Sequence, residues 1–168
     1  MKRSRRLSIG LLAALAFAPG LRAASPPVLR MPGQADRPVT AESLVGKESR
    51  DVRVEEPQGD VVVYHGMSLL DVLEKSGLDV KTMEGQRATA SMIVVVTGRD
   101  GYTAVFSVGE LRTNRENPKV FLVSETGSGP LPEDKGPVRL IVLGDRARSA
   151  YALAKIELKS LAENKKKP

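Results

Sequence analysis

The stretch that decides the fold is GPLPEDKGPVRLIVLG, residues 129–144. Its first half is rich in Gly and Pro and predicts a turn, whereas residues 138–143 predict a strand. Arg139 stands in this strand among apolar neighbours. A buried guanidinium needs an acceptor, because leaving it unpaired costs several kcal/mol. Its partner is therefore an internal carboxylate or an anionic ligand, and the sequence leaves both open.

A groove that accepts an anionic group is predicted around Arg139. The irregular loop 126–137 precedes the strand, and Arg146 and Arg148 follow it in the next turn. Together these segments form a basic spot that suits an anion. The alternative is an internal salt bridge for Arg139 and solvated turn positions for the other two arginines.

The rest of the chain alternates short strands and short helices. The run 90–97 is too apolar for an exposed edge and predicts a central strand. Ser68 and Ser107 each stand three residues before an acidic residue, which is the spacing of a capping box that begins a helix. The sequence therefore predicts an α+β domain, a β-rich mixed sheet with short helices. The other predicted strands are 51–56, 61–64, 102–106, 119–125 and 150–158.

The two ends of the chain differ from its middle. Residues 1–23 have the basic start, short apolar run and small residues of a cleaved signal peptide. Residues 24–38 are rich in Pro and polar groups and predict a flexible lead-in. The folded unit is expected over 39–162, followed by the basic tail 163–168.

Export places the protein in the periplasm or outside the cell. The apolar run of the signal, residues 7–18, is shorter than the roughly 20 residues that span a bilayer, so no permanent membrane span is expected. Arg5 and Arg6 resemble a twin-arginine signal in part, but Ser8 stands where that signal usually has Phe. The general secretory route is therefore favoured over the twin-arginine route.

Charge and composition exclude several classes of function. The chain has 26 Lys and Arg against 20 Asp and Glu, and five of the 26 lie in residues 1–23. The remaining 21 against 20 give no reason to bind nucleic acid. Without cysteine the chain has no disulfide, thiolate metal site or cysteine nucleophile, and a single histidine excludes a multi-histidine metal cage.

No residue is assigned a catalytic or metal-binding role. His65 is the only group that titrates near neutral pH by itself, and it is interpreted as a structural histidine at a strand end. Glu55 and Glu56 are interpreted as solvated surface groups, like the other scattered carboxylates. Gly127-Ser128-Gly129 is too short for a phosphate cradle and predicts a turn.

Three segments in order resemble the sulfite-oxidase-type molybdopterin-binding domain. They are 64–77 (YHGMSLLDVLEKSG), 100–111 (DGYTAVFSVGEL) and the stretch 129–144. The last is similar to the family's Gly-x-Pro-Leu … Gly-x-Pro-x-Arg-Leu segment almost step for step. The likeness extends over residues 39–161 and implies that family's fold.

The resemblance implies a cofactor site that is changed here. Arg139 matches the family's Arg that contacts the pterin, and Lys135 stands where many catalytic members have His. A Lys of catalytic relatives corresponds to Tyr151 or Ala152. Catalytic members bind molybdenum through a cysteine, which this chain lacks. Arg139, Arg148 and Lys135 are therefore expected as anion or pterin contacts, with molybdopterin as the cofactor that the resemblance suggests and none assigned with certainty.

These observations favour an exported accessory or binding module without redox catalysis of its own, which binds an anionic or pterin-like ligand near Arg139. Two alternatives stay open. One is a molybdopterin-dependent oxidoreductase subunit that binds its cofactor without a protein thiolate. The other is a domain that binds a partner in a periplasmic redox system through a sheet edge.

Overall fold

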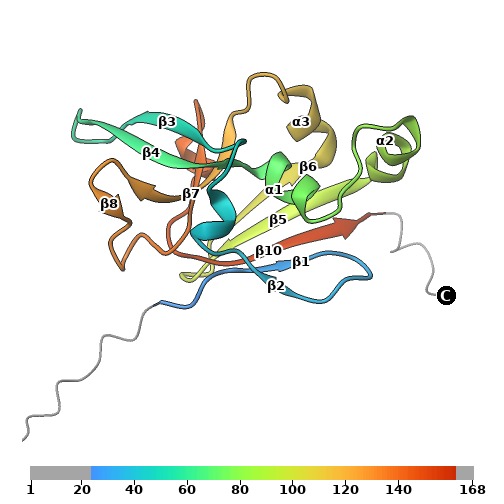
Figure 1. Ribbon diagram of the computed structural model, residues 1–168, viewed down its shortest axis with the longest axis horizontal. Helices are drawn as coiled ribbons and strands as arrows, with labels where there is room; N and C mark the ends of the chain where they lie inside the picture. The colour runs from blue at the N-terminus through green and yellow to red at the C-terminus, as the bar shows by residue number, and fades with distance from the viewer. Residues whose placement is uncertain (1–23, 162–168) are drawn as a thin grey trace, which may run out of the picture.

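The computed structural model of the chain describes residues 24–161. It shows a mixed α+β fold with two β-sheets and few short helices (Figure 1). The β-rich mixed sheet predicted from the sequence is thus two sheets, A and B. The predicted signal peptide 1–23 and basic tail 163–168 lie outside the described residues. Among the described residues, no helix has the length and apolar character needed to cross a membrane.

Sheet A has the strand order β2-β1-β10-β5-β6. Only the β1–β10 pair is parallel, and the other pairs are antiparallel. β5 lies between two neighbours and buries Val94 and Val96, which confirms the central strand predicted over 90–97. Gly101, with a φ of 85°, makes the turn between β5 and β6. The strands are β1 (Val28–Arg30), β2 (Arg37–Pro38), β5 (Met92–Gly98), β6 (Thr103–Ser107) and β10 (Leu153–Ser160).

The segment 24–38 was predicted as a flexible lead-in, but it contains two strands of sheet A, β1 and β2. Residues 28–30 form β1, which pairs with β10 in register Leu29 to Ile156. Leu29 is buried in the main core. Three residues are too few to show a period of two, so the strand is fixed by its partner and not by a local pattern.

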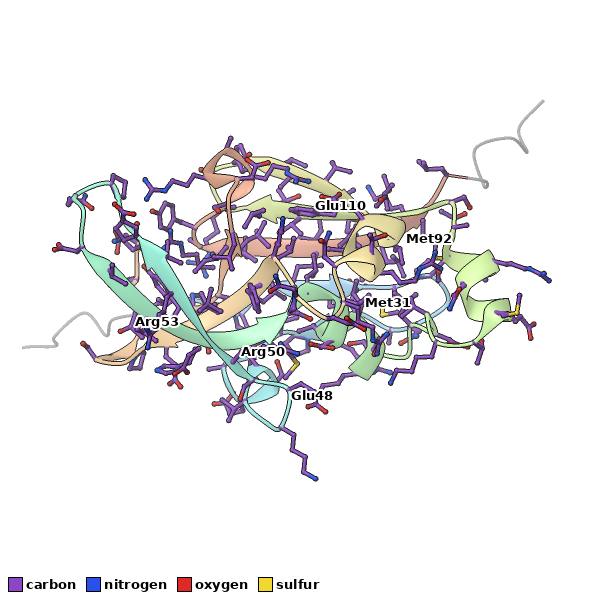
Figure 2. All side chains as sticks on the ribbon, turned by 90° about the horizontal axis from the view of Figure 1, so that it is seen from above. Met31, Glu48, Arg50, Arg53, Met92 and Glu110 are labelled. Carbon is purple, nitrogen blue, oxygen red and sulfur yellow. The ribbon has the colours of Figure 1, made fainter. Side chains whose placement is uncertain are left out.

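Sheet B has the order β3-β4-β7-β8, and β9 also pairs with β7. β7 therefore pairs with β4 on one side, and with β9 and β8 along different parts of its other side. β3 is an edge strand, and Arg50 and Arg53 on it are exposed (Figure 2). The strands are β3 (Arg50–Glu55), β4 (Val61–Ser68), β7 (Val120–Thr126), β8 (Gly129–Pro130) and β9 (Arg139–Val142).

β7 contributes to two separate hydrophobic clusters because both of its faces are apolar. Leu122 faces the main core, to which sheet A and the helices also contribute. Phe121 and Val123 face a second cluster, which includes Val52 of β3 and Ile141 of β9. Since β3 and β9 lie on opposite sides of β4 and β7, this cluster shows that sheet B curls around it.

The helices are short and begin at polar caps. The Oγ atoms of Ser68 and Ser107 accept hydrogen bonds from the backbone N–H of Asp71 and Glu110, as predicted. α2 was not predicted from the sequence, because its residues are mostly polar and include Gly85. The helices are η1 (Glu42–Leu44), α1 (Leu69–Lys75), α2 (Met83–Thr89), α3 (Val108–Thr113) and η2 (Arg146–Arg148).

Gly66 is the point of closest approach between β4 and β7. A Cβ atom at this position would lie 2.1 Å from the carbonyl oxygen of Leu122 and 2.7 Å from Cα of Val123. Both are backbone atoms of β7, so neither can move aside without breaking the strand pairing. Only glycine therefore fits this position.

We expect Gly66→Ala to lower the free energy of unfolding by about 2–3 kcal/mol, because the added methyl group has no space. Gly127→Ala is the matched control, since a Cβ there meets nothing within 4 Å. Urea unfolding of both variants measures the difference. Equal stability of the two variants would contradict the close approach.

Candidate binding site

Arg139 lies at the start of β9 and is 4% exposed. Side chains alternate along a strand, so Arg139 and Ile141 share one face and Leu140 faces the main core. Ile141 belongs to the second hydrophobic cluster. The guanidinium of Arg139 is therefore buried at the margin of that cluster, as its apolar sequence neighbours predict.

The partner of Arg139 is an internal carboxylate. Its Nη1 lies 2.8 Å from Oε1 of Glu56 and also donates to Oη of Tyr64 at 2.5 Å. Tyr64 donates in turn to the same Glu56 oxygen at 2.5 Å, which closes a three-membered network. Of the two partners that the sequence leaves open for Arg139, the structure shows the internal one.

Two tyrosines enclose the guanidinium. Its central carbon lies 4.9 Å from the ring centroid of Tyr64 and 4.3 Å from that of Tyr151. Nη2 donates to Oη of Tyr151 at 3.2 Å. Nε is buried and has no hydrogen-bond partner in the described part of the chain. Arg139 is thus held rigidly by one carboxylate and two rings.

Burial and hydrogen bonding shift two pKa values in this network. Burial raises the pKa of Glu56, but the hydrogen bonds from Arg139 and Tyr64 outweigh it, so the net pKa is below its ordinary value. Burial and the hydrogen bond to Glu56 raise the pKa of Tyr64 to about 12. At neutral pH the network therefore consists of an ionised Glu56, a charged Arg139 and a neutral Tyr64.

A cleft of about 550 Å³ lies next to this network. One wall is the end of β3 with Glu56 and Pro57, and the other is β9 with the turn that follows it. Arg139 and Tyr151 also line the cleft, together with Arg146 and Ser149 from the turn. Because β3 and β9 are opposite sides of the curled sheet, the cleft is the gap between them.

Besides Arg139, four side chains of the cleft carry a hydrogen-bond donor that has no acceptor among the described residues. Ser149 Oγ accepts from the backbone N–H of Val142, which leaves its own proton free. Tyr151 Oη accepts from Arg139 and likewise keeps its proton. Arg53 and Arg146 are exposed and form no ion pair within residues 24–161. The cleft can therefore donate to an acceptor-rich group.

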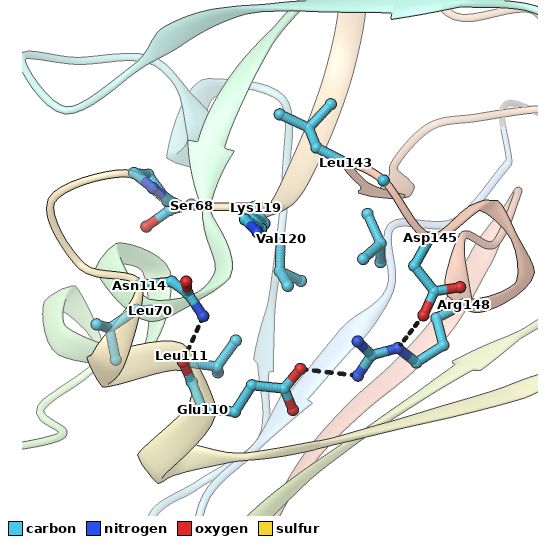
Figure 3. A pocket seen from close by; sticks show the side chains of 13 residues that line it. Ser68, Leu70, Glu110, Leu111, Asn114, Lys119, Val120, Leu143, Asp145 and Arg148 are labelled. Atoms are coloured by element: carbon cyan, nitrogen blue, oxygen red, sulfur yellow. Dashed lines mark hydrogen bonds and ion pairs between the residues drawn. The ribbon is translucent and has the colours of Figure 1, made fainter.

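The structure brings two of the three sequence-predicted contacts together. Nζ of Lys135 lies 5.8 Å from the ring centroid of Tyr151, so Lys135 and Arg139 both contact that tyrosine. Arg148 lies in a different cavity, where it pairs with Glu110 at 2.9 Å and Asp145 at 2.8 Å (Figure 3). The predicted groove therefore includes the Arg146 part of the turn but not Arg148.

Sequence reasoning missed the residues that complete the site. The interpretation of Glu56 as a solvated group is wrong, because its side chain is 12% exposed and bound to Arg139. Tyr64 and Ser149 were not expected in the site either. Glu56 is 83 positions from Arg139, and no local pattern signals so distant a pairing.

His65 lies within β4 and not at its end. Its Nδ1 is 2.6 Å from Oδ1 of Asp51, the residue opposite it on β3. Both side chains are on the solvated side of the hairpin, with exposed fractions of 36% and 68%. The predicted hydrogen bond of His65 is therefore present, and its partner is a carboxylate on the neighbouring strand.

The resemblance implies molybdopterin as the cofactor, but the residues of this site do not fit it. The chain has no cysteine to bind molybdenum. Three of the five N–H groups of Arg139 already bind protein oxygens, so only the buried Nε and one N–H of Nη2 remain at the pterin-contacting position. Within residues 24–161 no three His, Asp or Glu side chains are grouped as a metal site would need.

Removing the charge of Glu56 tests the network. We expect Glu56→Gln to lower the free energy of unfolding by about 3 kcal/mol, because it leaves a buried guanidinium without its counter-charge. Glu55→Gln, at the exposed neighbouring position, is the matched control and should change it by less than about 0.5 kcal/mol. Chemical denaturation at neutral pH measures both, and similar effects would show that the ion pair is unimportant.

Ionisation of the Tyr64 hydroxyl at high pH provides a second test of the network. A folded-state pKa of about 12, above the ordinary value of 10.0, means that the protein loses stability as pH rises between these values. With no tryptophan in the chain, near-ultraviolet absorbance follows tyrosine ionisation directly. We expect a step near pH 12 that Tyr64→Phe abolishes; a wild-type titration complete well below that pH would contradict the burial.

Comparison with known proteins leaves the site's geometry as the main guide to function. No family model matches the chain, and no curated protein is similar to it in sequence. The α+β class with two sheets is what the structure shows. The likeness of three segments to the sulfite-oxidase-type domain stays a prediction from the sequence.

Proposed function

We propose that this protein is a binding module that acts outside the cytoplasm, on a compact sulfite-oxidase-type scaffold, and holds a small anionic ligand in the cleft beside Arg139. The observation that carries the proposal is the set of unused donors on Arg146, Ser149 and Tyr151. A carboxylate or phosphate is the chemical group that such donors bind.

The rest of the cleft suits the organic part of the ligand. Val54 and Leu143 pack against the second hydrophobic cluster and line the cleft together with Ile141. Sites for small molecules combine mostly apolar walls with a few polar groups that fix orientation. An organic acid with an apolar body therefore fits better than an inorganic anion alone.

Binding without catalysis agrees with the groups that line the cleft. A general base must take up a proton near neutral pH, and the lowered pKa of Glu56 makes it a poor one. The residues that line the cleft include neither His nor Lys. Ser149 and Tyr151 can thus hold an acceptor, but no neighbouring base activates either hydroxyl.

The buried ion pair positions one of these donors, the hydroxyl of Tyr151. Arg139 holds the hydroxyl of Tyr151 by a hydrogen bond and by stacking on its ring. Lys135 contacts the same ring and adds positive charge next to the cleft. Both residues act through Tyr151, which differs from the direct contacts that the resemblance implies.

Calorimetric titration with benzoate and with inorganic phosphate tests the proposal. We expect benzoate to bind the purified protein, and Arg146→Gln to weaken binding about tenfold or more through loss of a charge-assisted hydrogen bond. Arg87→Gln on α2, another exposed arginine, is the matched control and should bind like the wild type.

Two results would overturn this function. One is the absence of binding by either probe to a folded protein, or equal affinity of Arg146→Gln and the wild type. The other is stoichiometric molybdenum in protein isolated from its native host, which would favour the oxidoreductase subunit.

A further inference from the structure

A second cavity of about 270 Å³ lies on the other side of the turn that follows β9 (Figure 3). Leu70 of α1, Leu111 of α3 and Val120 of β7 provide its apolar walls. Its volume is at the small end of ligand sites, which usually measure about 300–1,000 Å³. The cavity therefore suits a compact apolar group and not a nucleotide or a large cofactor.

Charged groups of both signs line the same cavity. Arg148 bridges Glu110 and Asp145, and its guanidinium stacks 4.9 Å from the ring centroid of Phe106. Lys119 is the fourth charged residue of the lining. Two cations and two anions give a net charge of zero, so the cavity favours neither a simple anion nor a simple cation.

The ion pairs leave a donor and two acceptors unused. Lys119 forms no ion pair with any residue that the structure describes. Glu110 uses only Oε1 for Arg148, which leaves Oε2, and Asn114 uses its Nδ2 for the carbonyl of Glu110, which leaves its amide oxygen. The two oxygens can accept from an ammonium, and Lys119, an exposed residue of the lining, can bind a carboxylate.

We propose that this cavity binds a free α-amino acid with an apolar side chain. Such a zwitterion carries the ammonium and the carboxylate on one carbon and has no net charge, as the cavity requires. Its side chain would lie against Leu70, Leu111 and Val120. This site is separate from the cleft beside Arg139 and does not depend on the function proposed there.

Calorimetric titration of the purified protein with L-leucine tests the proposal. Isovalerate and isoamylamine, which each keep one of the two charges, are the comparison ligands. We expect L-leucine to bind at least about tenfold more tightly than either, and Lys119→Met to weaken it by a similar factor. Lys47→Met, at an exposed position outside the cavity lining, is the matched control.

A second variant tests the contact between the protein and the ammonium group of the ligand. Asn114→Leu removes the amide oxygen and should weaken L-leucine while leaving isovalerate unchanged. The proposal is overturned if folded protein shows no heat with L-leucine, if isovalerate binds equally well, or if Lys119→Met and Lys47→Met have the same affinity. Circular dichroism of each variant shows that it is folded.

Discussion

A guanidinium taken out of water must meet acceptors inside the protein, and Arg139 meets that requirement with groups from three parts of the chain. Glu56 follows β3, Tyr64 lies on β4, and Tyr151 lies between η2 and β10. Within residues 24–161 these contacts join the two sides of curled sheet B, which no backbone hydrogen bond joins. The gap that remains beside them is the cleft. The shape of the candidate site thus follows from the need to pair one buried charge.

What the sequence could predict was local. The caps at Ser68 and Ser107 were predicted because their signals lie within four residues. The burial of Arg139 was predicted for the same reason, since its apolar neighbours are adjacent in the chain. β1 and α2 were missed, because a three-residue strand and a polar helix have little periodicity of their own.

Only some residues of the candidate site could be predicted from the sequence. Lys135 and Arg139 lie in the quoted stretch and do meet at Tyr151. The burial of Glu56 could not be predicted, because an acidic residue before a proline is typical of a solvated turn. Arg146 and Arg148 are two positions apart, and only the path of the turn shows that they line different cavities. Distant pairing and turn direction are tertiary information that periodicity does not contain.

The two cavities share the backbone of Val142, Leu143 and Gly144. Any shift of this segment would change the walls of both cavities at once.

The position of β10 has a consequence for biosynthesis. β10 is the middle strand of sheet A, between β1 and β5, although it is the last of the five strands along the chain. The β5–β6 hairpin and the β1–β2 pair can form early, yet β1 has no parallel partner until residues 153–160 are made. Sheet A therefore cannot close until residues 153–160 have joined it, although its β5–β6 hairpin needs no residue beyond 107.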